Sequence, residues 1–365
     1  MNHSKLDAYE SVRSEEIGRF VEGLKIACAD RQVVDVTNKV RSLVADIVCR
    51  TVMGRKCMEE RMDGAKFSEH IREVMRILGS FNLNDYLPMF KMFDLQGMRK
   101  QTRAVKVPID KFLETIIDEH VSLRERGKKP NDFVDMLLDS ADDPDSEIRL
   151  DRASIKAIIL DVFEGSLDTS PVAIEWAFVE LLRHPETMKK LREEIRTVVG
   201  MNRRVKESDL SRLTYLQMVV KESFRLHQPI PFLLHHNKKE STLGNYKIPA
   251  GSNVMICIWA MSRDPKLWSN AEEFVPERFE NDDVDVTGHD YRLLPFGSGR
   301  RGCPGMVFGM LVVPLILAQL VHCFDWELPG GTPPSELNME EKFGIAMPRV
   351  EHLRAVPTTY RLRDQ

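Results

Sequence analysis

The sequence is poor in cysteine, and its cysteines follow no pairing pattern. Six are scattered over 365 residues, with no CxxC arrangement among them. Sparse cysteine in a chain of this length argues against a disulfide scaffold and fits a reducing compartment. Clustered Cys/His ligands and a dinucleotide-binding glycine motif are also lacking, which excludes a zinc-dependent dehydrogenase.

The sequence also lacks an excess of charge of one sign and long apolar runs. The chain has 52 basic and 56 acidic residues, a net charge of −4, and no basic stripe, which predicts no nucleic-acid partner. Met1–Leu24 is polar and helical in pattern, unlike a signal peptide or a transmembrane span of about 20 apolar residues. The most apolar stretch, Met310–Val321, is too short by this measure and contains Pro314. We therefore expect no integral membrane segment in this chain.

Helical periodicity dominates up to about residue 225. Leu43–Val52 and Ile71–Leu78 place apolar residues three and four apart, which is typical of helices with one buried face. Lys156–Leu182 is long and mostly apolar, which predicts a helix through the middle of the protein.

The pattern changes after Arg225. Leu243–Pro249 and Ser252–Ile258 predict short strands joined by Pro-Ala-Gly, followed by a loop-rich stretch and one more apolar helix. The fold class is therefore mainly α with a small β-sheet region, and we expect a single domain over residues 1–365.

One glycine-rich segment carries the clearest chemical signal. Pro295–Gly305 reads PFGSGRRGCPG, with four glycines around Cys303 just before an apolar helix. Glycine lets a backbone approach a flat, bulky partner closely. A thiolate near a helix start is stabilised by the helix dipole and by the neighbouring Arg300 and Arg301. A lone buried cysteine is the simpler reading, but the order of eleven residue types argues against it.

This segment resembles the haem-binding loop of cytochromes P450, Phe-x-x-Gly-x-Arg-x-Cys-x-Gly. The resemblance implies that Cys303 ligates the iron of haem b (iron protoporphyrin IX) as a thiolate and that Arg301 pairs with a propionate. The loop residues that it assigns to the cofactor are Phe296, Gly297, Gly299, Arg301, Cys303 and Gly305.

Two further segments match P450 motifs that form a charge network behind the haem. Lys221–Arg225, KESFR, matches the Glu-x-x-Arg helix, and Phe274–Phe279, FVPERF, matches the Pro-Glu-Arg-Phe segment. By this resemblance Glu222, Arg225 and Arg278 form a buried structural network. By itself the Glu222/Arg225 spacing would indicate only a surface ion pair.

Asp161–Trp176, DVFEGSLDTSPVAIEW, resembles the long helix that crosses the distal haem face. The resemblance implies that Asp168 draws protons from solvent and that Thr169 relays them toward dioxygen, as general acid catalysis requires. Ser166 stands where a second glycine is usual, and Pro171 removes an amide donor. Glu164 is unusual: it is a polar substrate contact, a neutral acid with a raised pKa, or a side chain turned away.

The sequence around these motifs is similar to that of A-type plant P450s. This resemblance implies that a basic residue meets the second propionate, with His235 or His236 as the choices and His236 as our assignment. It also implies a substrate pocket lined by Glu164, Leu167, Ile230, Phe232, Phe343 and Ile345.

The resemblance further implies parts ahead of Met1: an anchor helix, a Pro-rich hinge, the first helices and strands, and a Trp-x-x-x-Arg segment. We therefore expect a cytochrome P450 fold lacking its N-terminal part, with no anchor in this chain. A chain of this kind is expected to bind haem weakly. Membrane association, at the cytoplasmic face of the endoplasmic reticulum, is expected only for a full-length form.

Three functions are compatible with these motifs. The first is a monooxygenase that oxidises a small lipophilic plant secondary metabolite, using O2 and electrons from NADPH through NADPH–cytochrome P450 reductase. The second is a catalytically inactive truncated P450 fragment. The third, a haem-thiolate isomerase or dehydratase, usually lacks an acid–alcohol pair, so Asp168 and Thr169 argue against it.

Overall fold

Helices form most of the chain that the computed structural model describes, which comprises residues 6–56, 64–87, 89, 93–128, 131–145 and 149–362. The α-helices are α2 (Glu10–Ala29), α3 (Val36–Met53), α4 (Gly64–Leu78), α5 (Leu83–Tyr86), α6 (Met98–Glu125), α7 (Phe133–Asp142), α8 (Arg152–Leu167), α9 (Thr169–Arg183), α10 (Pro185–Val199), α11 (Thr214–Leu226), α12 (Ile258–Met261) and α13 (Met306–Cys323). Short 3-10 helices are η2 (Glu207–Arg212), η3 (Pro276–Phe279), η4 (Gly299–Arg301), η5 (Pro329–Gly331) and η6 (Pro334–Glu336).

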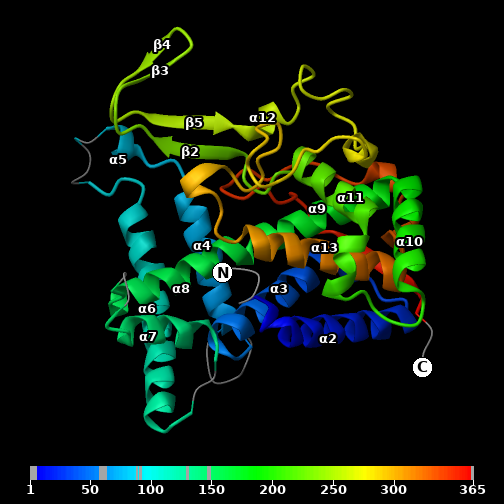
Figure 1. Cartoon of the computed structure of the whole chain (residues 1–365), viewed down its shortest axis with the longest axis horizontal. Helices are drawn as coiled ribbons and strands as arrows, with labels where there is room; N and C mark the ends of the chain where they lie inside the picture. Colours follow the sequence, from blue (N-terminus) through cyan, green and yellow to red (C-terminus); the bar gives the residue numbers. More distant parts are fainter. Residues whose placement is uncertain are drawn as a thin grey trace.

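The strands form small antiparallel sheets. They are β1 (Val34–Asp35), β2 (Phe232–His236), β3 (Ser241–Leu243), β4 (Tyr246–Ile248), β5 (Asn253–Cys257), β6 (Phe324–Glu327) and β7 (Arg354–Tyr360). β7 lies between β1 and β6, β2 pairs with β5, and β3 pairs with β4. The β3–β4 hairpin projects from one end of the molecule, while α10 and α11 lie at the other end (Figure 1).

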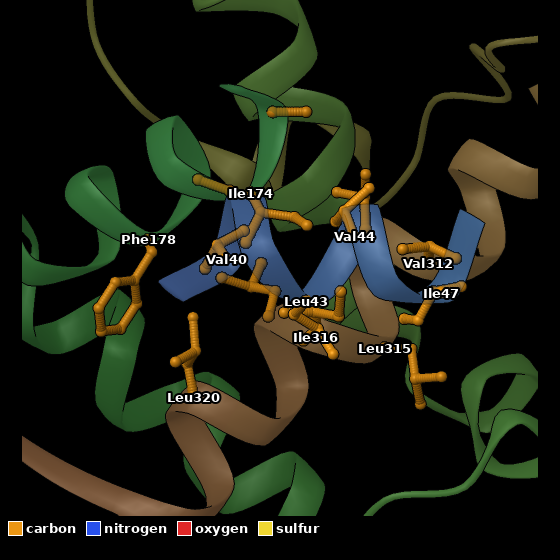
Figure 2. Packing of buried hydrophobic residues seen from close by; sticks show 14 of the residues in the cluster. Val40, Leu43, Val44, Ile47, Ile174, Phe178, Val312, Leu315, Ile316 and Leu320 are labelled. Carbon is orange, nitrogen blue, oxygen red and sulfur yellow. The ribbon is translucent and has the colours of Figure 1, made fainter. Parts of the chain in front are cut away.

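The core is built by α3, α9 and α13. The side chain of Asp35 caps the start of α3 by accepting from the amide of Asn38, and Gly54 ends the helix with φ of 69°. Figure 2 shows the meeting of the three helices, with these labelled residues: Val40, Leu43, Val44 and Ile47 of α3, Ile174 and Phe178 of α9, and Val312, Leu315, Ile316 and Leu320 of α13. Burying each such side chain contributes about 1.5–3 kcal/mol, so this contact fixes the positions of α9 and α13.

The helix α9 runs in the same direction as α13. Figure 2 places Phe178 near Leu320, and Ile174 further back along α9, nearer to Ile316 of the preceding α13 turn. The two helices pack against each other. Their N-terminal ends therefore lie toward the same end of the core, so the Thr169 end of α9 and the cysteine loop before α13 share that end.

The helix predicted over Lys156–Leu182 is present but interrupted. α8 ends at Leu167, Asp168 has φ of −111° and ψ of −43°, and α9 begins at Thr169. In Figure 1 the two helices nevertheless cross the molecule end to end.

The most apolar helix is longer than expected. α13 spans 18 residues and is long and apolar enough to cross a membrane by length and composition alone. The expectation that this apolar stretch is too short to do so is therefore wrong. However, 72% of it is buried inside the protein, and α13 is therefore a core helix.

The strand predictions were partly wrong. The segment Leu243–Pro249 is not one strand, because β3 ends at Leu243 and Gly244, with φ of 59°, turns the chain into β4. The strand expected over Ser252–Ile258 is β5, but it pairs with β2, which was not predicted, rather than with its neighbour in sequence.

Candidate active site

The cysteine loop is folded by its own backbone. The amide of Cys303 donates to the carbonyl of Phe296 at 2.8 Å, and the amide of Gly302 donates to that of Gly299 at 3.0 Å. Gly297 and Gly299 have φ of 69° and 71°, which side-chain-bearing residues rarely adopt. These bonds leave Cys303 exposed and without a disulfide, two residues before Gly305, which stands at the N-cap position of α13.

Two glycines permit close packing around this loop. A Cβ on Gly288 would lie 2.5 Å from the carbonyl oxygen of Gly297, and the Ser298 hydroxyl donates to the Gly288 carbonyl at 2.7 Å. A Cβ on Gly309 would lie 3.2 Å from the ring of Phe296. The loop is thus pressed onto α13 from one side and held by the segment at Gly288 from the other.

The structure brings the three predicted network residues together. Arg225 donates to both carboxylate oxygens of Glu222, at 2.8 and 2.9 Å, and Nε of Arg278 lies 2.9 and 3.1 Å from the same oxygens. Glu222 and Arg225 are fully buried. Arg225 also donates to the carbonyls of Ser262 and Ala271, at 2.6 and 2.7 Å. The network therefore joins α11 to the segment that precedes the cysteine loop.

The acid and the alcohol predicted on the distal helix lie at its interruption. The Thr169 hydroxyl donates to the carbonyl of Gly165 at 2.5 Å, and Asp168 is the single residue between α8 and α9. Burial raises the pKa of Asp168, and the positive charges of Arg41 and Arg72 offset part of this effect. A carboxyl group with a raised pKa holds a proton at higher pH than an ordinary aspartate.

The interruption explains two departures from the P450 pattern. Pro171 is the third residue of α9, where an amide has no partner in the preceding turn, so its missing N–H costs nothing there. The Ser166 hydroxyl donates to the carbonyl of Val162 at 2.6 Å, a bond that tends to bend helices. Burial and the nearby carboxylate of Asp161 raise the pKa of Glu164 above its ordinary value, and its three readings stay predictions.

The two candidate histidines occupy opposite faces of β2. Nδ1 of His236 lies 3.0 Å from Oδ1 of Asn253, its partner on β5. Because side chains alternate along a strand, His235 shares its face with Leu233, whose Cδ2 lies 3.6 Å from the Cβ position of Gly297. This alternation puts His235, and not His236, on the face of β2 that Leu233 shares, and which histidine meets a propionate stays a prediction.

The predicted pocket residues differ in how far they are buried. Leu167 belongs to the buried core, whereas Phe343 is 77% exposed. The segments of Ile230 and Ile345 are adjacent, because the amide of Met347 donates to the carbonyl of Pro229 at 2.9 Å.

A family model described as Cytochrome P450 matches residues 1–354. The chain belongs to the cytochrome P450 family.

Several plant P450s are similar over nearly all of this chain. It is 45% identical to Cytochrome P450 CYP736A12 of Panax ginseng, over 98% of this chain and 72% of that protein. It is 39% identical to Cytochrome P450 71A1 of Persea americana, over 94% of this chain and 70% of that protein. It is 36% identical to 3,9-dihydroxypterocarpan 6A-monooxygenase of Glycine max, over 96% of this chain and 70% of that protein. The protein is accordingly a cytochrome P450 monooxygenase with haem as its cofactor.

The residues of this P450 fit the haem that the family carries. The Cys303 thiol is exposed at a glycine-rich surface that a flat ring can approach, and a Cβ on Gly305 would lie only 3.7 Å from its Sγ. Arg301 is exposed, and no carboxylate in the described part of the chain pairs with it. A thiolate ligand and a propionate partner are therefore both accessible in the loop.

Sequence reasoning missed the arginines that face Asp168. Arg41 lies on α3 and Arg72 on α4, and only the packing of these helices around α8 brings their charges near the acid. No local pattern marks either residue, since both stand on ordinary amphipathic helices.

Proposed function

We propose that this P450 oxidises a small lipophilic plant secondary metabolite, using O2 and electrons from NADPH delivered by NADPH–cytochrome P450 reductase. The observation that carries the proposal is the cysteine loop, which leaves the Cys303 thiol accessible at the start of α13. The relative from Glycine max, named for a pterocarpan monooxygenase, supports an oxygenated plant product as the substrate class.

Cys303, Arg301 and one of the β2 histidines would hold the haem, which would supply the activation of dioxygen when bound. The chain itself supplies protons. We assign to Asp168, whose pKa is raised by burial, the role of passing a proton to the adjacent Thr169. The Thr169 hydroxyl donates to Gly165 at rest, so it releases that carbonyl when it donates toward the oxygen site.

We assign the substrate pocket to the two segments at Ile230 and Ile345 and to the α8 end opposite them. Ile345 packs against the end of α4, where its backbone nitrogen lies 3.1 Å from the Cβ position of Gly79. The pocket wall would thus combine the apolar side chains of Ile230 and Ile345 with the carboxyl group of Glu164. Such a lining suits a lipophilic molecule that carries a hydroxyl or carbonyl group.

The exposed arginines of the cysteine loop support the reductase as electron donor. Arg300 is exposed in η4, next to Arg301, which is assigned to a propionate. Basic residues beside the ligating cysteine are complementary to an acidic partner surface, which speeds association through electrostatic attraction.

We propose that the region between α4 and α6 contributes to the attachment of a full-length form to the endoplasmic reticulum membrane. Its exposed large apolar side chains are Leu78, Phe81, Tyr86, Leu87, Met89, Phe93 and Leu95. Beside them, an open groove of about 1060 Å³ is lined in part by Arg99, Arg103, Lys106 and Lys111. Apolar side chains next to basic ones match a bilayer surface that contains anionic lipid.

We also treat residues 1–365 as a single domain. α3 packs against both α8 and α9, and α9 packs against α13, so the early and late helices share one core.

The test is spectroscopic. The reduced, carbon-monoxide-treated protein should show the absorption band typical of haem-thiolate, and Cys303→Ala should lose it. Cys257→Ala, which removes another free cysteine, is the matched control and should keep the band. A thiolate band in Cys303→Ala would overturn the proposal.

A further inference from the structure

Residues 340–350 form a narrow loop that is closed at its neck. Glu341 and Arg349 form an antiparallel bridge, the amide of Lys342 donates to the carbonyl of Pro348 at 2.8 Å, and the amide of Val350 donates to that of Glu340 at 3.0 Å. Beyond this neck lies the tip, residues 343–347, which carries the two late pocket residues named above. We call residues 340–350 the pocket loop.

The tip is fastened to α9 by one tryptophan. Nε1 of Trp176 donates to the carbonyl of Met347 at 2.9 Å, across 171 residues of sequence. Trp176 is only 1% exposed, and its ring is stacked on that of His227, with centroids 4.1 Å apart and planes at 3°. The guanidinium of Arg349 lies 5.9 Å from the same ring centroid. The pocket loop therefore contacts the indole at both its tip and its neck.

A histidine stands between a carboxylate of α9 and one of the pocket loop. Nε2 of His227 lies 2.6 Å from Oε1 of Glu180, and its Nδ1 lies 3.6 Å from Oε1 of Glu341. The other oxygen of Glu341 accepts from Nε1 of Trp259 at 3.2 Å. Glu180 is 3% exposed and His227 7%, so little water competes for these contacts.

This arrangement specifies position rather than adding apolar stability. A buried set of charged and polar groups is often no more stabilising than an apolar core, but its contacts fit one geometry. The hydrogen bonds here run from Trp176 to Met347 and between His227 and Glu180, while Nδ1 of His227 faces Glu341 without a hydrogen bond. Here that geometry links the pocket loop to α9, the helix that begins at Thr169. The same helix thus carries the alcohol of the acid–alcohol pair at one end and the attachment of the pocket loop about two to three turns later.

We propose that Trp176, His227 and Glu341 are positioning residues that fix the pocket loop against α9 and thereby set the place of Phe343 and Ile345 in the substrate pocket. The part of this proposal that concerns Phe343 and Ile345 rests on the proposed function, because the assignment of these residues to the substrate pocket does. Changes at these positions should alter which molecules fit while leaving the attachment of the cofactor loop intact.

Trypsin tests the attachment directly, because Lys342 is exposed in the pocket loop. Trp176→Phe keeps an aromatic ring over His227 but removes the donor to Met347, and it should speed cleavage after Lys342 by about tenfold. Cleavage after Arg126, in the exposed turn that follows α6, should not change and serves as the internal reference. A general rise at both sites would indicate global unfolding and would overturn the specific attachment.

Glu341→Gln is the second variant, since it removes the charge facing His227 and retains an oxygen for Trp259. It should speed the same cleavage by about threefold. Glu340→Gln, one residue away with an exposed side chain, is the matched control and should behave as wild type. Wild-type cleavage rates in both Trp176→Phe and Glu341→Gln would refute the attachment.

Ligand binding tests the pocket half separately. In the haem-loaded protein, 4-phenylimidazole and imidazole both ligate iron, but only the larger one reaches the pocket wall. The affinity for 4-phenylimidazole, read from the haem absorption spectrum, should change about fivefold in Glu341→Gln, while that for imidazole stays within about twofold. Faster cleavage with unchanged 4-phenylimidazole affinity would keep the attachment and refute the assignment of the loop to the pocket.

Discussion

Replacing Glu222 by glutamine should destabilise the protein strongly, although the side chain keeps its size. Its two carboxylate oxygens accept from Arg225 and Arg278 at 2.8–3.1 Å, and Oε1 also accepts from the amide of Val275 at 2.8 Å. A glutamine has one acceptor oxygen, and its amide group would point N–H bonds at a guanidinium that can only donate.

The magnitude follows from the charge left behind. Arg225 keeps its backbone acceptors, the carbonyls of Ser262, Ala271 and Glu273, but loses its buried counter-charge. Removing one partner from a buried ion pair costs about 3–5 kcal/mol. With a urea dependence of about 3 kcal/mol per M, the unfolding midpoint should fall by at least about 1 M.

Urea titration followed by tryptophan fluorescence measures this shift. Glu193→Gln, at an exposed position of α10, is the matched control and should change the free energy of unfolding by no more than about 0.5 kcal/mol. If Glu222→Gln unfolds at the same urea concentration as the control, the network does not hold α11 to the segment before the cysteine loop.

Three further outcomes are expected. Thr169→Ala should keep haem but release peroxide in place of product, and unchanged coupling of oxygen use to product would show that the hydroxyl is only structural. Burial lowers the pKa of His120, but the hydrogen bond to Asp132 and the charge of that carboxylate raise it by more. The net pKa therefore lies above the usual 6.5. The stability that protonated His120 contributes is complete below pH 6.5 and is lost as the pH rises through the folded-state pKa. The gap in urea midpoint between wild type and His120→Gln should therefore shrink above pH 6.5. A gap that stays constant with pH would contradict this. Replacing both Arg99 and Arg103 by glutamine should weaken binding to vesicles containing anionic lipid by about 2 kcal/mol, roughly 30-fold, without changing binding to neutral vesicles; equal binding to anionic vesicles would rule out the groove as the contact.

The parts of the site that are local in sequence could be predicted, because short motifs fix short-range geometry. The cysteine loop closes on itself through the bond between Cys303 and Phe296, seven residues apart. Glu222 and Arg225 meet because helix geometry places residues three apart on one face. That Arg278 joins them was available only from resemblance, since 53 residues separate it from Arg225.

The parts that depend on tertiary packing could not be predicted. The apolar pattern of α8 and α9 is broken over residues 164–171, where Asp168, Thr169 and Pro171 indicated an irregularity, but the pattern did not place the interruption at Asp168. Strand β2 was missed because it exists through its pairing with β5, whose nearest residue lies 17 positions beyond His236. Trp176 and Met347 are joined by folding alone.

The interruption at Asp168 also has a mechanical consequence. α3 packs against both helices, but α8 also packs against α4, α6 and α7, whereas α9 also packs against α10, α11 and α13. An unbroken helix would lock these two halves into one rigid rod, but a single non-helical residue lets each half tilt with its own neighbours. Any such tilt concentrates its dihedral change at the acid itself. Parting the outer helices to admit a bulky molecule and resetting the surroundings of the proton donor are therefore the same movement.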